Sequence, residues 1–243
     1  MLGLKVDADR RLIACGRLTG RLFVYDTANG ALLARFTSGR SERTLVNDAV
    51  IAPDGVAYVT DSFLPVLYRV ALRAIPLGRE ATPSAEVPEQ EAEVFLDFTG
   101  SAFAYDPEEV NANGLVASAD GTALLIVKTN TGELYRVDLA TREVAEMPVD
   151  GGDLQGVSGM ALDGTTLWAL RDRTPELIRV EVDAGLTRGT VLSTSGDPTF
   201  DLPTTLALIG DGTALVVNHQ LEPGEGGAES PQPFIVSRLV LPR

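Results

Sequence analysis

The sequence predicts an all-β protein, a β-propeller built from four-stranded blades. Five short turns recur along the chain, each between two apolar runs, and a strand of one type follows each turn. No helical 3.6-residue pattern persists over a useful length. The 243 residues, 44% of them hydrophobic, suffice for the core of one large β domain, so we assign residues 1–243 to a single propeller.

The five turns are the first sign of the repeat. Asp-Gly between apolar runs is a strong hairpin signal, because glycine reaches positive φ at little cost. Three of the four intervals between turns are close to the roughly 40–50 residues of a propeller blade. The turns are Asp9-Arg10, Asp54-Gly55, Asp120-Gly121, Asp163-Gly164 and Asp211-Gly212.

Two further strand types follow the turns at regular distances. Nearly continuous apolar runs directly after the turns suit strands buried between blades; they are residues 56–60, 123–127, 166–170 and 214–217. A third strand follows, with polar residues alternating; its copies are residues 22–25, 67–70, 134–137, 177–180 and 235–239. The fourth strand, as in residues 143–147, is weakest, which suits an outer edge. We count five units, beginning near Leu2, Val46, Asn113, Val157 and Leu202.

Two insertions interrupt the repeat. Residues 76–90 are rich in Pro, Glu and Ala and lengthen the second unit, and residues 222–233 are rich in Gly, Glu and Pro and split the last one. We expect both to be surface loops; the alternative is a lid or a partner contact.

Charge and composition restrict the partners. Duplex binding normally needs a basic face, and the net charge of -14 argues against one, so we expect no nucleic-acid partner. No apolar run approaches the ~18 residues of a membrane helix, so we expect no membrane insertion.

Cys15 lies in an apolar run and is expected to be a buried, inert thiol. The chain begins without a signal peptide, which predicts a cytoplasmic protein if Met1 is the true start and an extracytoplasmic one if an upstream signal has been lost.

Polar residues mark one face of the predicted ring. The first two strands of a blade are antiparallel, so the start of one and the end of the next meet at the same face, the usual ligand mouth. We predict ligand-binding residues there, and their oxygen atoms suit hard cations such as Ca²⁺ or Mg²⁺. These residues are Asn47, Asp48, Asp61, Asn130, Asp172 and Asn218. The same residue types also begin strands simply to satisfy turn backbone groups. Asn47 and Asn113 stand out because both have the same register on an inner strand.

The sequence shows no motif for a catalytic triad, a zinc site or a phosphate-binding loop. His219 is the only histidine, and its surroundings show no nucleophile elbow. No Cys/His cluster exists for a zinc site, and no glycine-rich phosphate loop precedes a helix.

Three segments carry a resemblance to a known family. Asn47-Asp48 is followed by the Asp54-Gly55 turn and the strand 58–61, residues 111–115 contain an Asn-Gly-Leu motif, and residues 156–160 are followed by the strand 167–169. In order and spacing the sequence resembles the gluconolactonase/regucalcin family, the senescence-marker-protein-like propellers. The resemblance implies six blades and one divalent cation (Ca, Mg, Mn or Zn) held by Glu, Asn and Asp, with the Asp acting as base in lactone hydrolysis.

Carried over by position, the resemblance makes Asn113 a metal ligand and Asn47 a residue that positions metal or substrate. Ser158 stands where the family has its Asp and is therefore the candidate catalytic residue, although a hydroxyl is a poorer base and ligand than a carboxylate. The family's Glu lies in a first blade that has no counterpart here, so we expect an N-terminal blade to be missing or truncated and the exposed edges to favour self-association.

Two functions follow. One is a metal-dependent lactone or ester hydrolase with a degenerate metal site, and the other is a non-catalytic propeller that binds a small molecule or a protein at its mouth. We expect weak or absent metal binding. A carboxylate entering the mouth from elsewhere, such as Asp48, Asp61, Asp153 or Asp172, favours the hydrolase.

Overall fold

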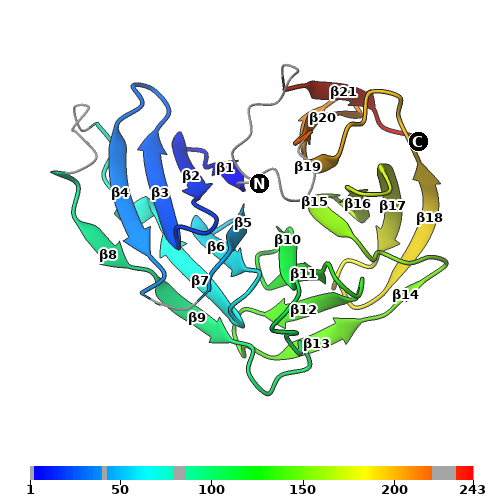
Figure 1. Cartoon of the computed structure of the whole chain (residues 1–243), viewed down its shortest axis with the longest axis horizontal. Coiled ribbons are helices and arrows are strands. Elements are labelled where there is room, and N and C mark those ends of the chain that lie inside the picture. Colours follow the sequence, from blue (N-terminus) through cyan, green and yellow to red (C-terminus); the bar gives the residue numbers. More distant parts are fainter. Residues whose placement is uncertain (1–2, 40–42, 79–85, 221–233, 243) are drawn as a thin grey trace.

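A computed structural model describes residues 3–39, 43–78, 86–220 and 234–242. Five mainly antiparallel sheets stand around a common axis, like the blades of a propeller, in an arc that is open between the first and last blades (Figure 1). Within each blade, strands that follow one another in the chain pair side by side. The only helix in these ranges is the three-residue η1 (Leu72–Ala74), so none is long and apolar enough to cross a membrane.

The strands follow the predicted order, but only blades 2 and 3 have the predicted four strands: blades 1 and 4 each gain a parallel edge strand, and blade 5 has three strands within the described residues. Blade 1 contains β1 (Leu4–Val6), β2 (Arg11–Cys15), β3 (Arg21–Asp26), β4 (Leu32–Thr37) and β8 (Glu89–Glu91). Blade 2 contains β5 (Val46–Ile51), β6 (Val56–Asp61), β7 (Val66–Ala71) and β9 (Glu93–Asp97), and blade 3 contains β10 (Ala112–Ala117), β11 (Ala123–Lys128), β12 (Leu134–Asp138) and β13 (Val144–Met147). Blade 4 contains β15 (Val157–Asp163), β16 (Thr166–Arg171), β17 (Glu176–Val182), β18 (Gly189–Ser195) and β14 (Val149–Asp150). Blade 5 contains β19 (Pro203–Gly210), β20 (Thr213–Asn218) and β21 (Val236–Val240).

The five recurring turns are hairpins between the first two strands of the blades. The second turn residue has positive φ every time: 72° at Arg10, 84° at Gly55, 70° at Gly121, 59° at Gly164 and 67° at Gly212. Glycine adopts this conformation at little cost, whereas Arg10 reaches it against the steric preference of an L-residue. The all-β prediction and the hairpins are therefore confirmed.

The first insertion is not entirely a loop, which corrects our prediction for residues 76–90. Glu89–Glu91 form β8, which leaves blade 2 and pairs in parallel with β4 of blade 1. Val87 beside it is buried. The predicted loop at residues 222–233 lies outside the described residues.

The hydrophobic core consists of layers between neighbouring blades. Ile13, Val24 and Tyr68 belong to the layer of blades 1 and 2, and equivalent clusters fill the next three interfaces. The second strands contribute most, since Leu124 to Val127 of β11 are all fully buried. Cys15 is buried and free in the first layer, as expected.

The innermost strands approach one another closely at glycines. A Cβ on Gly114 of β10 would lie 2.6 Å from the Ser158 carbonyl oxygen, and one on Gly159 of β15 would lie 2.5 Å from the Thr204 carbonyl oxygen. Since real Cβ atoms do not come this close, these positions need glycine to let the strand starts meet around the axis.

We expect Gly114→Ala and Gly159→Ala to lower the free energy of unfolding by about 1–3 kcal/mol, because the added methyl forces neighbouring backbone apart. Gly196→Ala is the matched control, since its Cβ would meet only an ordinary contact at 3.5 Å. Urea unfolding measures all three. Equal stability of the three variants would contradict the close approach.

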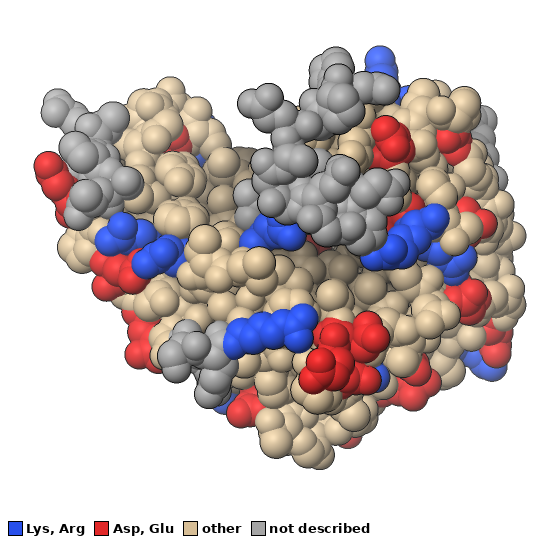
Figure 2. All heavy atoms as spheres, in the orientation of Figure 1, with Lys and Arg blue, Asp and Glu red and all other residues tan. Residues whose placement is uncertain are grey.

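The faces that border the open side of the arc are apolar. On β20 and β21, Val217 is 41% and Val236 57% exposed, and on β1, Leu4 is 54% and Val6 56% exposed. Acidic and basic side chains are interspersed over the rest of the face in Figure 2, so no single-sign patch dominates it.

Candidate functional site

A repeated β-bulge shapes the start of four inner strands. The register shifts between Val46 and Ala49 in β5, Ala112 and Leu115 in β10, Val157 and Gly159 in β15, and Pro203 and Thr205 in β19. A bulge re-aims side chains and is common next to functional sites. The residues that follow the first residue of each strand are Asn47, Asn113, Ser158 and Thr204, all buried. The structure thus places the three predicted residues, and Thr204 with them, at one register position.

Side-chain hydroxyls hold this ring of bulges together. Thr60 Oγ1 donates a hydrogen bond to the Asn113 carbonyl (2.9 Å), and Ser62 Oγ donates to the Ala112 carbonyl (2.6 Å). Thr129 Oγ1 donates in the same way to the Val157 carbonyl of the following blade. The ends of β6 and β11 therefore fix the bulges of β10 and β15 in the following blades.

Two buried amide oxygens have no partner. Asn113 is only 5% exposed, and its Oδ1 accepts no hydrogen bond from any described group. Asn130 Oδ1, in the loop after β11, is in the same situation. An unsatisfied buried acceptor costs about 1–3 kcal/mol, so these oxygens are the best candidates for contact with a ligand. Asn47 differs, because its Nδ2 donates to Ser62 Oγ at 2.8 Å.

One carboxylate reaches the position where the resembling family has its Asp. Asp172 follows β16 and has its Oδ2 3.4 Å from Ser158 Oγ, while its Oδ1 accepts the Arg173 backbone N–H at 2.6 Å. Asp172 is half-buried. The serine and this carboxylate together thus bring an acidic group to the bulge of β15.

His219 lies near this carboxylate, although sequence reasoning set it aside. It is half-buried and lines the central cavity directly after β20. Burial lowers the pKa of the imidazole, and the negative charge of Asp172 opposes that shift. Its position directly after a second strand is the feature of the sequence that predicts its place at this face.

Two predicted ligand residues act inside the scaffold. Asp61 Oδ1 accepts the backbone N–H groups of Leu45, Phe63 and Leu64 at 2.9–3.0 Å, and Thr44 Oγ1 donates to its Oδ2. Asn218 Nδ2 donates to Ser237 Oγ at 2.9 Å, and its Oδ1 accepts the Asp201 N–H at 3.0 Å. Both side chains brace the ends of their own blades.

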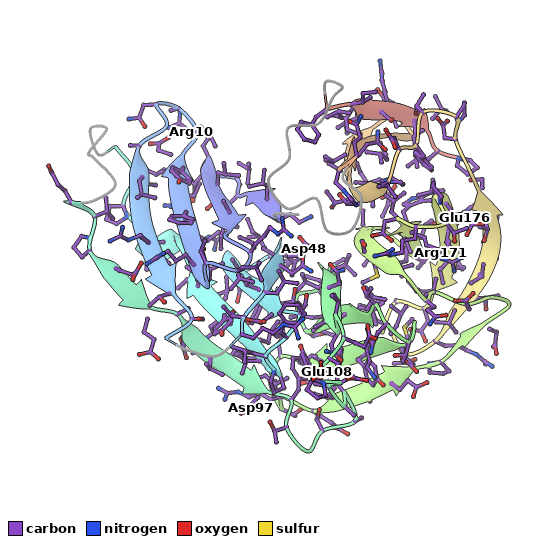
Figure 3. The ribbon with its side chains drawn as sticks, in the orientation of Figure 1. Arg10, Asp48, Asp97, Glu108, Arg171 and Glu176 are labelled. Carbon is purple, nitrogen blue, oxygen red and sulfur yellow. The ribbon has the colours of Figure 1, made fainter. Side chains whose placement is uncertain are left out.

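Asp48 lies toward the centre of the ring but is covered (Figure 3). Its Oδ1 accepts the Ala49 N–H at 2.8 Å, and a Cβ on Gly3 of the neighbouring segment would lie 2.5 Å from this oxygen. Burial raises the pKa of the carboxyl, and the charge of Lys5 opposes the rise. Asp48 is therefore a buried acid beneath the start of β1.

The donor set fits a tightly held divalent cation poorly. The described residues contain no group of three or more His, Cys, Asp or Glu side chains placed to hold a metal. The bulges offer amide and hydroxyl oxygens. Of the carboxylates beside them, Asp48 and Asp61 are buried and accept backbone N–H groups, and Asp172 is half-buried. Ca²⁺ takes 6–8 oxygen ligands and gains affinity from carboxylates.

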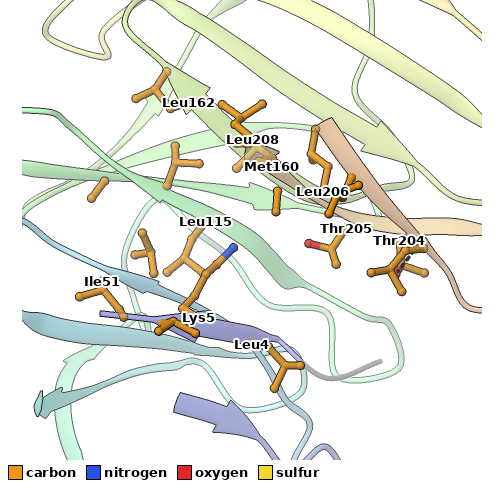
Figure 4. Close-up of a pocket in the computed structure, with 18 of the residues that line it drawn as sticks. Leu4, Lys5, Ile51, Leu115, Met160, Leu162, Thr204, Thr205, Leu206 and Leu208 are labelled. Atoms are coloured by element: carbon orange, nitrogen blue, oxygen red, sulfur yellow. Dashed lines mark hydrogen bonds between the residues drawn. The ribbon is translucent and has the colours of Figure 1, made fainter. Parts of the chain in front are cut away.

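A cavity of about 1080 Å³ runs beside the inner strands. Arg17, Thr204, Asn218 and His219 line it toward the bulged ends, and its walls are apolar, with Ile51, Leu115, Met160 and Leu206 among them (Figure 4). Thr204 is the bulge residue that borders this space, since Asn47, Asn113 and Ser158 are not among its lining residues.

No protein-family model matches the chain, and no curated protein matches it. Many solved structures share its fold. The calcium-binding protein regucalcin from Agrobacterium tumefaciens is 18% identical over 98% of this chain and 75% of that chain, with a TM-score of 0.60. A streptogramin B lyase is 10% identical over 100% and 69% (TM-score 0.55), and a protein of unknown function from Bacteroides caccae is 11% identical over 98% and 77% (TM-score 0.62). At these identities the likeness shows the propeller fold alone.

We expect Asp61→Ala to lower the free energy of unfolding by about 3 kcal/mol, because several buried N–H groups lose a charged acceptor. Asp172→Ala, whose carboxylate makes a single backbone contact and a long one to Ser158, should change it by less than about 1 kcal/mol. Urea unfolding of both variants makes the comparison. A larger loss at Asp172 would show that this residue, too, belongs to the scaffold.

Proposed function

We propose that this chain is a propeller of the gluconolactonase/regucalcin type that binds a small molecule at the bulged ends of its inner strands and hydrolyses a lactone or ester there. One observation carries the proposal: the Asp172 carboxylate reaches Ser158, the residue at the family's base position. The unpartnered Asn113 oxygen on the neighbouring inner strand supports it.

The proposed reaction is addition of water to the carbonyl carbon. Asp172 accepts a proton from the attacking water as the new C–O bond forms, and the bond to the leaving alkoxide then breaks. The alkoxide then takes up the proton from Asp172, directly or through His219 or water, which restores the carboxylate. A lactone leaves as one hydroxy acid, and an ester as an acid and an alcohol. The Ser158 hydroxyl and the Asn113 amide N–H groups are the donors that we propose for the developing oxyanion.

We propose that the chain binds a divalent cation only weakly. The regucalcin structure is described as a calcium-binding protein, and Asn113 Oδ1 is a suitable oxygen. The shortage of carboxylates argues for a dissociation constant near the millimolar range or weaker. No step of the proposed reaction runs through the metal.

The second candidate is a non-catalytic ligand-binding propeller. It is favoured by the hydroxyl of Ser158 in place of a carboxylate and by the mainly apolar cavity beside the mouth. Retained binding without turnover distinguishes it from the hydrolase.

We expect slow hydrolysis of aliphatic lactones or aryl esters by the native chain and a 10²- to 10⁴-fold lower kcat for Asp172→Asn, the range of general base catalysis. Asp163→Asn is the matched control, because Asp163 is exposed at the other end of β15.

In calorimetric titrations with Ca²⁺, Mn²⁺ and Zn²⁺, Ser158→Asp should bind metal more tightly than the native chain. Tight stoichiometric binding by the native chain, weakened in Asn113→Ala, would contradict the weak site.

We also propose that a sixth blade closes the ring, as the family resemblance implies. The open faces of β1 and β19–β21 have the apolar character of the covered interfaces, and the similar structures are longer, since this chain spans 69–77% of them. An uncovered apolar face promotes association.

Residues 1–243 by themselves are therefore expected to self-associate as their concentration rises. Val217→Lys and Val236→Lys should reduce the association by placing charge on the open face. Val94→Lys is the control, because Val94 is 38% exposed on the outer strand of blade 2. Sedimentation velocity over a range of concentrations measures the effect. A monomer at every concentration would count against the sixth blade.

A further inference from the structure

The close contacts of the inner strands define a common level around the axis. Gly3 meets Asp48, Gly114 meets Gly159, and Gly159 meets Thr205, so these residues lie side by side. Two positions further along each strand come Lys5, Val50, Val116, Ala161 and Ala207, and all five line the cavity. Lys5 is the one charged residue at a level where the other strands carry valine or alanine.

The described residues that line the cavity are cationic or neutral, whereas the chain as a whole is acidic. The sequence has 34 acidic and 20 basic residues, yet no carboxylate is among the described residues that line the cavity. Lys5 and Arg17 supply two positive charges, and His219 lies at the same end as Arg17. Apolar walls of low dielectric strengthen the attraction of these cations for an anion inside.

The Lys5 amine is available for such an anion. Its side chain is half-buried and extends beside Leu115 into the cavity (Figure 4). Among the described residues it makes no ion pair and no hydrogen bond; it acts on Asp48 only through its charge, and that carboxyl is already bonded to the Ala49 N–H. A half-buried ammonium in an apolar wall is costly unless a counter-charge accompanies it.

We propose that the cavity binds a small carboxylic acid with an apolar body, whose carboxylate pairs with Lys5 while its hydrocarbon part packs against Ile51, Leu115 and Met160. The volume of about 1080 Å³ lies just above the roughly 300–1,000 Å³ of ligand pockets because it includes the open side of the arc at Leu4 and Val236, and the part between the inner strands admits a medium-length chain or a ring system. Carboxylates are also the products of lactone and ester hydrolysis, which extends the proposed function to apolar acyl groups.

The test is calorimetric titration of the native chain with octanoate, octanol and octylammonium, which share one apolar body and differ in charge. Octanoate should bind about tenfold more tightly than octanol, because a hydrogen bond to a charged group adds to the same apolar contacts, and octylammonium should bind more weakly than either. Octanoate has no scissile bond, so a failure to bind it and a failure to hydrolyse esters are separate results.

Lys5→Met should lower the octanoate affinity to that of octanol and leave octanol binding unchanged, whereas Lys5→Arg should retain the preference. Lys128→Met is the control, because Lys128 ends β11 and is not a lining residue. Thermal unfolding confirms that each variant is folded. Equal affinity of the native chain for octanoate and octanol, or an octanoate affinity that Lys5→Met does not change, would overturn the proposal.

Discussion

The close approach of the inner strands at their bulged starts is the constraint on which this structure depends. At the bulges of β10 and β15, hydroxyls from the preceding blade satisfy backbone carbonyls, as Thr60 does for Asn113 and Thr129 for Val157. Glycine at 114 and 159 removes the Cβ that would keep the strands apart. The blades are thereby fixed to one another at the end where the candidate site lies, and the apolar layers stabilise the rest.

This arrangement divides the polar residues of the mouth into two kinds. Asp61, Asn218 and Thr60 satisfy backbone or side-chain groups of the blades, so removing them costs stability. Asn113 and Asn130 keep an oxygen without a partner, and Asp172 has capacity beyond its contact with the Arg173 N–H. Buried polar groups are normally paired. A ligand that bonds to the unpaired oxygens therefore gains the most binding free energy, and replacing these residues costs the scaffold the least stability.

Sequence reasoning predicted the repeat because its signals are local. Each hairpin needs a residue at positive φ, and each buried second strand needs a continuous apolar run, so both leave a pattern. β8 left none, because Glu89–Glu91 are exposed and pair with a strand far away in the chain. Scaffold and site residues could not be separated either. Asp61 and Asp172 follow second strands in the same way, and only their contacts distinguish them.

The net charge of a chain says little about the field inside one of its cavities. The -14 charge lies on side chains that are mostly solvated and screened within about a Debye length, roughly 8–10 Å at moderate salt. A cation such as Lys5 in an apolar wall is screened much less, since few mobile ions and little water lie between it and a bound group. An acidic propeller can therefore bind an anion at its axis. Its surface charge then lowers the association rate constant more than it lowers the affinity.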